Sequence, residues 1–313
     1  NYWPVCRLDR GPLALMSKAL VCGAGGQLGQ ELVLTCPEQW QAIPMTRSML
    51  DIADPDQVAK ALDDTEPAWV INAAAFTAVD AAESEPELAH RVNAIGPEVL
   101  ALQCRERNIR LLHVSTDFVF DGAQGRPYAP DAEPNPLGVY GRSKLEGENA
   151  VMAAGGSPVI LRTGWVYSRH GGNFVKTMLR LMADREQLSV VEDQVGTPTW
   201  ARGLALTCWG LANHGDASGI YHWSDAGACS WYDFAVAIRE IALELGLLRQ
   251  AATLLPIPAS QYPTPAQRPG YSVLDKAQTR DLLVEPTNHW AGQLRAMLVD
   301  LQQHQQQHEK LQP

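Results

Sequence analysis

A strand, a glycine turn and a helix near residue 20 constrain the fold of this chain more than any other feature of its sequence. The apolar residues 19–22 predict a short buried strand, and Gly23, Gly26 and Gly29 follow it in the spacing Gly-x-x-Gly-x-x-Gly. A helix is predicted over residues 27–34. This order lets the backbone approach a pyrophosphate, whose charge then lies at the helix N-terminus. A glycine cluster alone is more often an ordinary turn, but its place between strand and helix favours a dinucleotide site with contacts at Gly23, Gly26, Gln27, Leu28 and Gly29.

Predicted strands and helices alternate along the first half of the chain. This alternation is typical of an α/β fold with a doubly wound parallel sheet, the Rossmann fold. Open parallel sheets bind their ligands at the carboxyl ends of the strands, so the loops that follow the strands are expected to carry the functional side chains. Apolar runs predict buried strands at residues 19–22, 41–44, 69–75, 111–116 and 159–163.

The order of predicted elements changes after residue 167, and this change divides the chain. We expect residues 16–167 to form a dinucleotide-binding domain. Residues 168–300 mix helices, short strands and a proline-rich stretch, so we expect mainly a second, smaller substrate-binding domain, with some segments returning to the first. Residues 1–15 lack periodicity and are expected to be a non-native or disordered extension. The Gln- and His-rich residues 301–313 are expected to be a frayed tail.

Charge and cysteine content exclude several classes of protein. A formal net charge of -10 and a pI near 5.3 argue against nucleic acid or an anionic membrane surface as a partner. No apolar run approaches the roughly 20 residues of a membrane span. The 6 cysteines include no Cys-x-x-Cys pair, so we expect reduced thiols, no zinc site and a cytoplasmic location.

Arg47 follows the second predicted strand, where an NAD-selective site usually carries an acidic residue for the ribose diol. A guanidinium at this position can pair with a 2′-phosphate, so we expect NADPH as the cofactor. The alternatives are a solvated loop arginine and the use of NADH, and both stay open. Asp51 and Ile52, shortly afterwards, are candidates for contacts with the adenine edge.

The next two strands end in small or hydroxyl-bearing residues. Ala73, Ala74 and Ala75 close the third strand and leave room for a cofactor. Thr77 lies in the loop that follows them. The fourth strand ends at Thr116, which brings a hydroxyl to the same edge of the sheet.

Tyr140 and Lys144 lie four residues apart on a helix predicted from residue 140 towards 154, so both side chains point to one face. A phenol has a reference pKa of about 10. A cation about 5 Å away, at an effective dielectric of ~20, lowers that pKa by roughly 2 units. We therefore expect Tyr140 to act as a general acid supported by Lys144. Because such pairs also occur on ordinary solvated helices, the argument depends on the glycine turn and Thr116 as well.

Together these residues resemble the extended short-chain dehydrogenases/reductases, and within them the dTDP-4-dehydrorhamnose reductases. The resemblance covers about residues 16–299 and rests on motifs at 26–29, 72–80, 115–122, 136–148, 172–179, 193–199 and 268–272. It implies that NADPH reduces the C4 ketone of a nucleotide sugar, dTDP-4-dehydro-L-rhamnose. It also implies that Thr116 holds the carbonyl oxygen, Tyr140 donates the proton and Lys144 binds the nicotinamide ribose. The substrate contacts implied by the resemblance are Thr116, Asp117, Phe118 and Trp165.

The resemblance also bears on metal content and assembly. Some members of the family are dimers with magnesium held by carboxylates at the interface, and Glu31 and Asp300 match those positions. Arg202 stands where a further carboxylate would be, so we expect no metal. Whether the chain forms a homodimer stays open.

Two other functions compete with the reductase. The regulatory subunit of methionine adenosyltransferase has a related fold and binds NADP without catalysis, but the combination of Thr116, Tyr140 and Lys144 favours an enzyme. A nucleotide-sugar epimerase or dehydratase is the nearer alternative. Related dehydratases carry Asp and then Glu after the Thr, whereas here Asp117 is followed by Phe118, which cannot exchange a proton. The sequence therefore favours the reductase.

Overall fold

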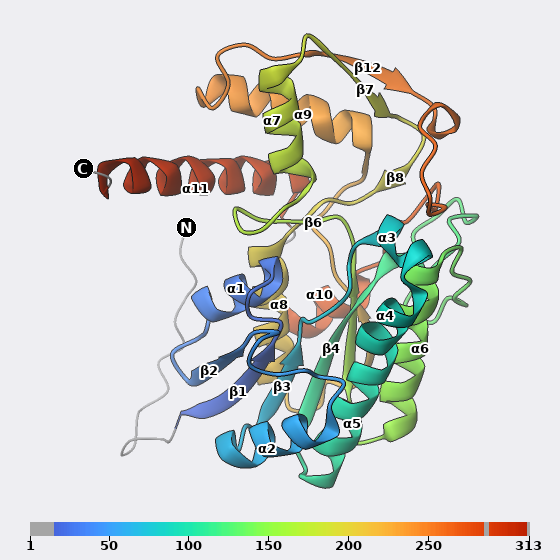
Figure 1. Cartoon of the computed structure of the whole chain (residues 1–313), viewed down its shortest axis with the longest axis vertical. Helices are drawn as coiled ribbons and strands as arrows, with labels where there is room; N and C mark the ends of the chain where they lie inside the picture. The colour runs from blue at the N-terminus through green and yellow to red at the C-terminus, as the bar shows by residue number, and fades with distance from the viewer. Residues whose placement is uncertain (1–15, 285–287, 312–313) are drawn as a thin grey trace.

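A parallel sheet of six strands forms the centre of the larger part of the chain. The computed structural model describes residues 16–284 and 288–311 (Figure 1), so the extension predicted at 1–15 lies outside the described residues. The strand order is β10-β5-β4-β3-β1-β2, and every neighbouring pair is parallel. This confirms the predicted doubly wound α/β sheet. Its strands are β1 (Ser17–Cys22), β2 (Trp40–Met45), β3 (Trp69–Asn72), β4 (Arg110–Thr116), β5 (Val159–Thr163) and β10 (Gly219–His222).

The chain changes its direction across the sheet between β1 and β3. It steps from β1 outward to β2 and then crosses back to place β3 on the other side of β1. At such a switch point the loops that follow the two strands diverge and leave a crevice for a ligand. Here those loops are the glycine turn after Cys22 and the alanine stretch after Asn72.

Helices cover both faces of the sheet (Figure 1). On one face α1 and α8 pack over Ala19 and Val21, and on the other α2, α5 and α6 pack over Leu20 and Val70. Successive residues of β1 enter opposite clusters, as expected for a strand that is buried on both faces. These helices are α1 (Gln27–Leu34), α8 (Ala201–Asn213), α2 (Pro55–Thr65), α5 (Gly96–Glu106) and α6 (Val139–Ala154).

Most of the second half of the chain forms a separate group of elements, at the top of Figure 1. Its apolar cluster gathers around Phe234 and includes Met178, Leu188 and Leu298. Helix α11 continues to Leu311, through the stretch where the sequence predicts a frayed tail. Within the described part of the chain, no helix combines the length and the apolar character needed to cross a membrane. The elements of this group are β6 (Val166–Tyr167), α7 (Phe174–Asp184), β7 (Gln187–Val191), β8 (Val195–Gly196), β9 (Thr199–Trp200), β11 (Cys229–Ser230), α9 (Trp231–Glu244), β12 (Thr253–Ile257) and α11 (Trp290–Leu311).

Three pieces of the second half return to the large sheet. Strand β10 pairs with β5 at the edge, in register from Gly219 opposite Val159. Helix α8 packs on α1, and α10 (Ala277–Leu283) adds Leu282 and Leu283 to the same apolar cluster. The large sheet is therefore completed by residues far along the chain.

The helical segment between β3 and β4 consists of three pieces. Helix α4 (Pro86–His90) leads into a π-helical turn (Arg91–Ile95), which leads into α5. Within the turn, Asn93 accepts a hydrogen bond from the Phe76 amide at 2.8 Å and donates one to the Phe76 carbonyl at 3.0 Å. These bonds tie the helical segment to the loop after β3. A short helix, α3 (Val79–Ser84), follows the same loop.

Candidate active site

A cavity of about 400 Å³ opens at the carboxyl ends of the strands, at the switch point. It brings together residues of the glycine turn, the loop after β3, the end of β4, the first turns of α6 and the segment after β5. Ser115, Thr163 and Asn173 also line it, although sequence reasoning did not select them. The predicted residues in its lining are Gly26, Gln27, Leu28, Ala73, Ala75, Thr77, Thr116, Asp117, Phe118, Tyr140, Lys144 and Trp165.

Two glycines let the first turn lie directly against the backbone after β3. Gly23 has a φ of +77°, and a Cβ added to it would come within 2.6 Å of the Ala74 nitrogen. A Cβ at Gly29 would come within 2.2 Å of the Gly23 carbonyl oxygen. Gly26 caps α1 and has no side chain to cover the first amides of the helix. The turn therefore fits a phosphate at the N-terminus of α1, with Gly23, Gly29 and Ala74 supporting the wall of the cavity from behind.

Strand β3 ends at Asn72, earlier than the predicted end at residue 75. The Asn72 Oδ1 accepts the Ala74 amide at 3.1 Å, and this local bond turns the backbone out of the sheet. As a result Ala73 and Ala75 line the cavity, while Ala74 packs against Gly23.

Arg47 lies outside the cavity lining, on the turn that follows β2, and its side chain is exposed. This turn is next to the glycine turn, because the Met45 carbonyl accepts the Ala24 amide at 3.0 Å. Arg47 is therefore close to the glycine turn in the fold but does not line the cavity.

Asp51 and Ile52 also lie outside the lining. The Asp51 carboxylate accepts from Arg91 at 2.6 Å, and the Ala53 amide and Arg91 hold the pKa of Asp51 below its usual range. The Ile52 side chain is buried and fills the space beside Gly96, where an added Cβ would come within 2.6 Å of its Cδ1. The Ile52 side chain therefore belongs to the core, which leaves its backbone for any contact with adenine.

Tyr140 lies in the first turn of α6, and its ring packs edge-on against Phe118 with centroids 5.5 Å apart. Burial raises the pKa of Tyr140 to about 12; a hydrogen bond with Thr116 opposes the increase and the Asp117 charge adds to it. The predicted lowering of this pKa by Lys144 is therefore wrong, because burial dominates. The hydroxyl keeps its proton at neutral pH, as a proton donor must.

Lys144 is buried one turn further along α6 and directs its amine to the back of the cavity. Its Nζ donates to the Val114 carbonyl at 2.7 Å and lies 3.3 Å from His113 Nε2. Burial lowers the pKa of Lys144 to about 8, with Glu148 acting in the opposite direction. Sequence reasoning missed His113 because its contact with Lys144 spans 31 positions and leaves no local pattern.

Thr116 and Asp117 form a bonded pair at the end of β4. The Thr116 hydroxyl donates to Asp117 Oδ1 at 3.1 Å and accepts from the Phe118 amide at 3.2 Å. Burial raises the pKa of Asp117 to about 6, against hydrogen bonds from Ser272 and Thr116. A Cβ at Gly164 would come within 2.5 Å of the carboxyl group, so glycine is needed there. These contacts hold the Thr116 hydroxyl beside Tyr140.

Ser115 and Thr163 bring two further hydroxyls to the cavity. Both oxygens are buried and have no hydrogen-bond partner among the described residues. A buried hydroxyl without a partner is unfavourable, so both groups are suited to bond a polar atom of a ligand. Each residue stands at the carboxyl end of a parallel strand, so the same edge argument that selected Thr116 could have found them.

Trp165 forms the wall between the two groups of elements. It has a φ of +51° just after β5, and its ring stacks on Trp231 with centroids 3.5 Å apart and planes at 4°. A Cβ at Gly196 would come within 2.5 Å of the Trp165 ring, which keeps that position free of a side chain. The indole is thereby fixed in orientation at the cavity.

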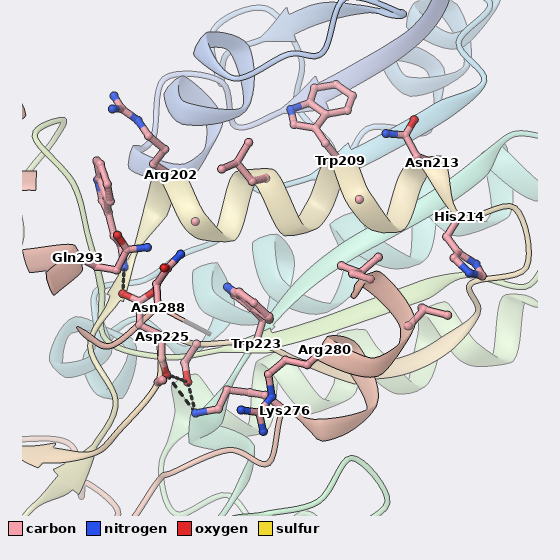
Figure 2. Close-up of a pocket in the computed structure, with 18 of the residues that line it drawn as sticks. Arg202, Trp209, Asn213, His214, Trp223, Asp225, Lys276, Arg280, Asn288 and Gln293 are labelled. Carbon is pink, nitrogen blue, oxygen red and sulfur yellow. Dashed lines mark hydrogen bonds between the residues drawn. The ribbon is translucent and has the colours of Figure 1, made fainter. Parts of the chain in front are cut away.

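A larger cavity, of about 890 Å³, lies along α8. Figure 2 shows Arg202, Trp209 and Asn213 projecting from this helix, with Lys276 and Arg280 below it in that view. Among the described residues, the two cavities share no lining residue. The larger one lacks both the glycine turn and the Tyr140 and Lys144 pair, so we take the smaller one as the candidate active site.

Arg202 lines that larger cavity and joins the two carboxylates that match family metal positions. Its Nε bonds Glu31 and its Nη2 bonds Asp300, each at 3.1 Å. Ser168 also donates to Glu31, and Arg169 pairs with Asp300. In the part of the chain that the structure describes, no three His, Cys, Asp or Glu side chains are grouped to hold a metal ion.

The model of the RmlD substrate binding domain family matches residues 17–303. The chain belongs to this family. It is 41% identical over 278 residues to a dTDP-4-dehydrorhamnose reductase of Burkholderia thailandensis, covering 84% of this chain and 92% of that protein. It is 40% identical over 278 residues to a dTDP-4-keto-6-deoxy-D-glucose reductase of Streptomyces niveus, covering 88% and 94%.

A solved structure shows the same likeness. The NADP complex of a dTDP-4-dehydrorhamnose reductase from Bacillus anthracis superimposes with a TM-score of 0.86 at 33% identity, covering 91% of this chain and 100% of that one. Membership of the RmlD substrate binding domain family confirms the resemblance predicted from the motifs.

Proposed function

We propose that this RmlD-family chain uses NADPH to reduce the C4 ketone of dTDP-4-dehydro-L-rhamnose, giving dTDP-L-rhamnose. One observation carries the proposal: a single cavity joins the N-terminus of α1 to the side chains of Thr116, Tyr140 and Lys144. A carbonyl reductase needs a dinucleotide and a proton donor that reach the same carbonyl group. The relatives named above support this choice of reaction.

The residues of the cavity have distinct roles in this reaction. Thr116 holds the ketone oxygen, and Tyr140 gives its proton to that oxygen while hydride reaches the C4 carbon. Lys144 bonds the hydroxyls of the nicotinamide ribose. NADPH, when bound, supplies the hydride.

The residues around the switch point would hold the dinucleotide. The amides after Gly23 and Gly26 bind its pyrophosphate, and Arg47 pairs with the 2′-phosphate. Gly29 and Ala74 keep the wall close, and the backbone at Asp51 and Ile52 faces the adenine. The rest of the dinucleotide would contact five further residues of the cavity: Gln27, Leu28, Ala73, Ala75 and Thr77.

The sugar lies between the two groups of elements, against Asp117, Phe118 and Trp165. We assign nucleotide binding mainly to residues 16–167 and sugar binding mainly to residues 168–300, with α8, β10 and α10 belonging to the first group. A homodimer, which rests on the family resemblance, and a cytoplasmic location, which rests on the cysteine content, complete the proposal.

The test is an assay of NADPH oxidation with dTDP-4-dehydro-L-rhamnose. Two other substrates are assayed in parallel: dTDP-4-keto-6-deoxy-D-glucose, and UDP-4-dehydro-L-rhamnose. We expect one NADPH consumed per dTDP-L-rhamnose formed. Conversion of dTDP-glucose to its 4-keto-6-deoxy product with NAD and no added reductant would instead identify a dehydratase.

A further inference from the structure

Trp165 has a backbone conformation that an aromatic residue rarely adopts. Its φ of +51° lies in the left-handed region, where the Cβ of a bulky residue is crowded, so the surrounding fold must hold it there. The residue stands between the end of β5 at Thr163 and the start of β6 at Val166. This turn places a single indole, and that indole lines the candidate active site.

Thr199 of β9 holds the backbone of this turn at two carbonyl groups. Its amide donates to the Trp165 carbonyl at 3.1 Å, and its hydroxyl donates to the Gly164 carbonyl at 2.6 Å. Thr199 is fully buried, so water does not compete for these bonds. It belongs to the motif at 193–199, to which the proposed reaction gives no role.

Two further residues hold the indole ring itself. The Trp231 ring covers one face of Trp165, with centroids 3.5 Å apart and planes at 4°. Gly196, from the same motif as Thr199, lies at the edge that carries Nε1, because an added Cβ would come within 2.6 Å of that atom. A ring that is confined on one face and along one edge cannot rotate about its side-chain bonds without collision.

Trp231 is in turn fixed at the start of α9. Ser230 caps this helix: its hydroxyl accepts the Asp233 amide at 3.1 Å, and the Asp233 carboxylate accepts the Ser230 amide at 3.0 Å. Phe174 of α7 packs against the Trp231 ring with centroids 4.6 Å apart. The second group of elements therefore presents a fixed ring to Trp165.

Trp165 lines the cavity, whereas Trp231, Phe174 and Gly196 do not. Because Trp231 covers one face of the indole, the cavity meets the remaining apolar surface of the ring. An indole face packs well against C–H groups and gives a hydroxyl group no hydrogen bond. This wall is therefore suited to a C–H-bearing face or a methyl group of a deoxy sugar.

We propose that Trp231 is a positioning residue for sugar binding: it fixes the Trp165 indole as the apolar wall of the sugar site without contacting the sugar. The sugar as the ligand of this wall rests on the proposed function, while the fixed orientation of the indole is a property of the folded chain. The glycine turn, Ala73 and Ala75 build the cofactor side of the cavity from other segments. Loss of the Trp231 ring should therefore weaken sugar binding and spare NADPH.

Trp231→Leu removes the stacked ring and keeps an apolar side chain. A contact made equally with the bound sugar and with the transition state changes KM and leaves kcat in place. We expect KM for the keto sugar to rise about tenfold, the scale of a lost aromatic pair, with kcat and the Kd of NADPH within about twofold of the parent. Trp231→Phe keeps a ring against Trp165 and should restore most of the affinity. If Trp231→Leu weakens NADPH and lowers kcat as much as it raises KM, Trp231 is merely structural and the proposal is wrong.

The orientation of the indole can be measured without turnover. In protein labelled with ¹⁵N-tryptophan, each indole N–H gives one NMR signal, and the Trp165 signal is assigned by its loss in Trp165→Phe. The NOE from this N–H to the Gly196 Hα reports the contact along the ring edge. We expect this NOE in the parent protein and in Trp231→Phe, and its loss in Trp231→Leu. An NOE of parent strength in Trp231→Leu would overturn the proposal, whether or not the chain reduces the sugar.

Gly196→Ala disturbs the same ring from its edge and leaves Trp231 in place. It should also raise KM for the sugar about tenfold, and it decides the proposal if Trp231→Leu does not fold. The matched control is Trp290→Leu, which removes a buried indole from the same apolar cluster; Trp290 packs on Phe234 and does not line the candidate site. This variant should lower the melting temperature and keep the parent KM and NOE. An equal rise of KM in Trp290→Leu would contradict the proposal, because loss of packing alone would then explain the effect.

Discussion

Tyr140 keeps its proton because its hydroxyl is buried beside the Asp117 carboxyl group. Tyr140→Phe removes this hydroxyl and leaves the ring packed on Phe118. We expect turnover to fall by about 10²- to 10⁴-fold, the usual contribution of general acid catalysis, with little change in NADPH affinity. The measurements are kcat at saturating sugar and the Kd of NADPH from its fluorescence. Near-normal turnover would exclude Tyr140 as the donor.

Lys144 makes the stability of the folded chain depend on alkaline pH in a predictable direction. Burial lowers its pKa from 10.5 to about 8, so between these values the unfolded chain binds a proton that the folded chain has lost. Its contribution to stability therefore rises with pH across this window and is unfavourable and constant below it. Lys144→Met should stabilise the protein below pH 8 by up to roughly 3 kcal/mol, and the gain should shrink as the pH rises through the window.

Denaturant unfolding of both proteins across this range measures the difference. Lys60→Met is the control, because Lys60 is exposed and pairs with Asp64 on the surface of α2. A stability difference for Lys144→Met that does not change with pH would contradict the assigned shift.

Arg47 tests the choice of cofactor. Only NADPH carries the 2′-phosphate, so Arg47→Ala should weaken NADPH by about tenfold to a hundredfold, the scale of a lost charge-assisted hydrogen bond, and leave NADH nearly unchanged. The Kd values of the two nucleotides decide this. Equal weakening of both would mean that Arg47 does not contact the phosphate.

For single residues, the spacing in the sequence predicts which side chains share the cavity better than it predicts their pKa values and hydrogen-bond partners. The separation of four correctly placed Tyr140 and Lys144 on one helix face. The pKa of Tyr140 depends instead on burial, and the direction of the Lys144 amine depends on Val114 and His113, which lie 30 and 31 positions away. Such contacts leave no trace in local sequence.

Among the elements, the π-helical turn and α6 fit each other closely. The Asn93 carbonyl would come within 2.1 Å of a Cβ at Gly147, in the middle of α6. Gly147→Ala should therefore destabilise the fold by about 3 kcal/mol or more, although alanine is the better helix former. Thermal and urea unfolding measure the change.

Gly292→Ala provides the matched control, because Gly292 is an exposed helical glycine of α11 with open space around its added Cβ. There the substitution should be neutral or stabilise by up to about 1 kcal/mol. Destabilisation of both variants to the same degree would show that the contact with Asn93 is not the cause.

Element boundaries show the same division between local and distant causes. The helix start near Tyr140 and the helix after the glycine turn were predicted because their signals are local. The π-helical turn was not predicted, because it is fixed by the bonds of Asn93 to Phe76 and by its fit to Gly147.

For the whole molecule, Arg202 links three parts of the chain through Glu31 of α1 and Asp300 of α11. Its guanidinium supplies the positive charge between the two carboxylates. Treatment with a chelator should therefore leave activity and melting temperature unchanged. Activity that is lost on chelation and restored by magnesium would show that a metal is needed.

A substitution that replaces the Arg202 cation with a carboxylate gives a second test of the metal question. Arg202→Glu brings a third carboxylate into the cluster, so the melting temperature should fall by several degrees in the absence of divalent cations, and magnesium should restore part of it. The parent protein is the control and should not respond to magnesium.

The pairing of strand β10 with β5 is the feature of the whole sheet that the sequence did not predict. The four residues Gly219–His222 have no distinctive pattern, and their partner β5 lies about sixty positions earlier, in register at Val159. The parallel sheet itself was predictable from alternating elements, but its edge depends on a pairing between strands about sixty positions apart.

This late edge strand has a consequence for synthesis on the ribosome. When Tyr167 has emerged, β5 still has an open edge, and the face of α1 that later meets α8 is uncovered. The nascent chain must wait for β10 before its first five strands are protected, and an open edge in that interval invites pairing with other chains. A gene fragment that stops at Tyr167 therefore lacks α8, β10 and α10, and recombination with relatives should keep these three elements together with residues 17–167.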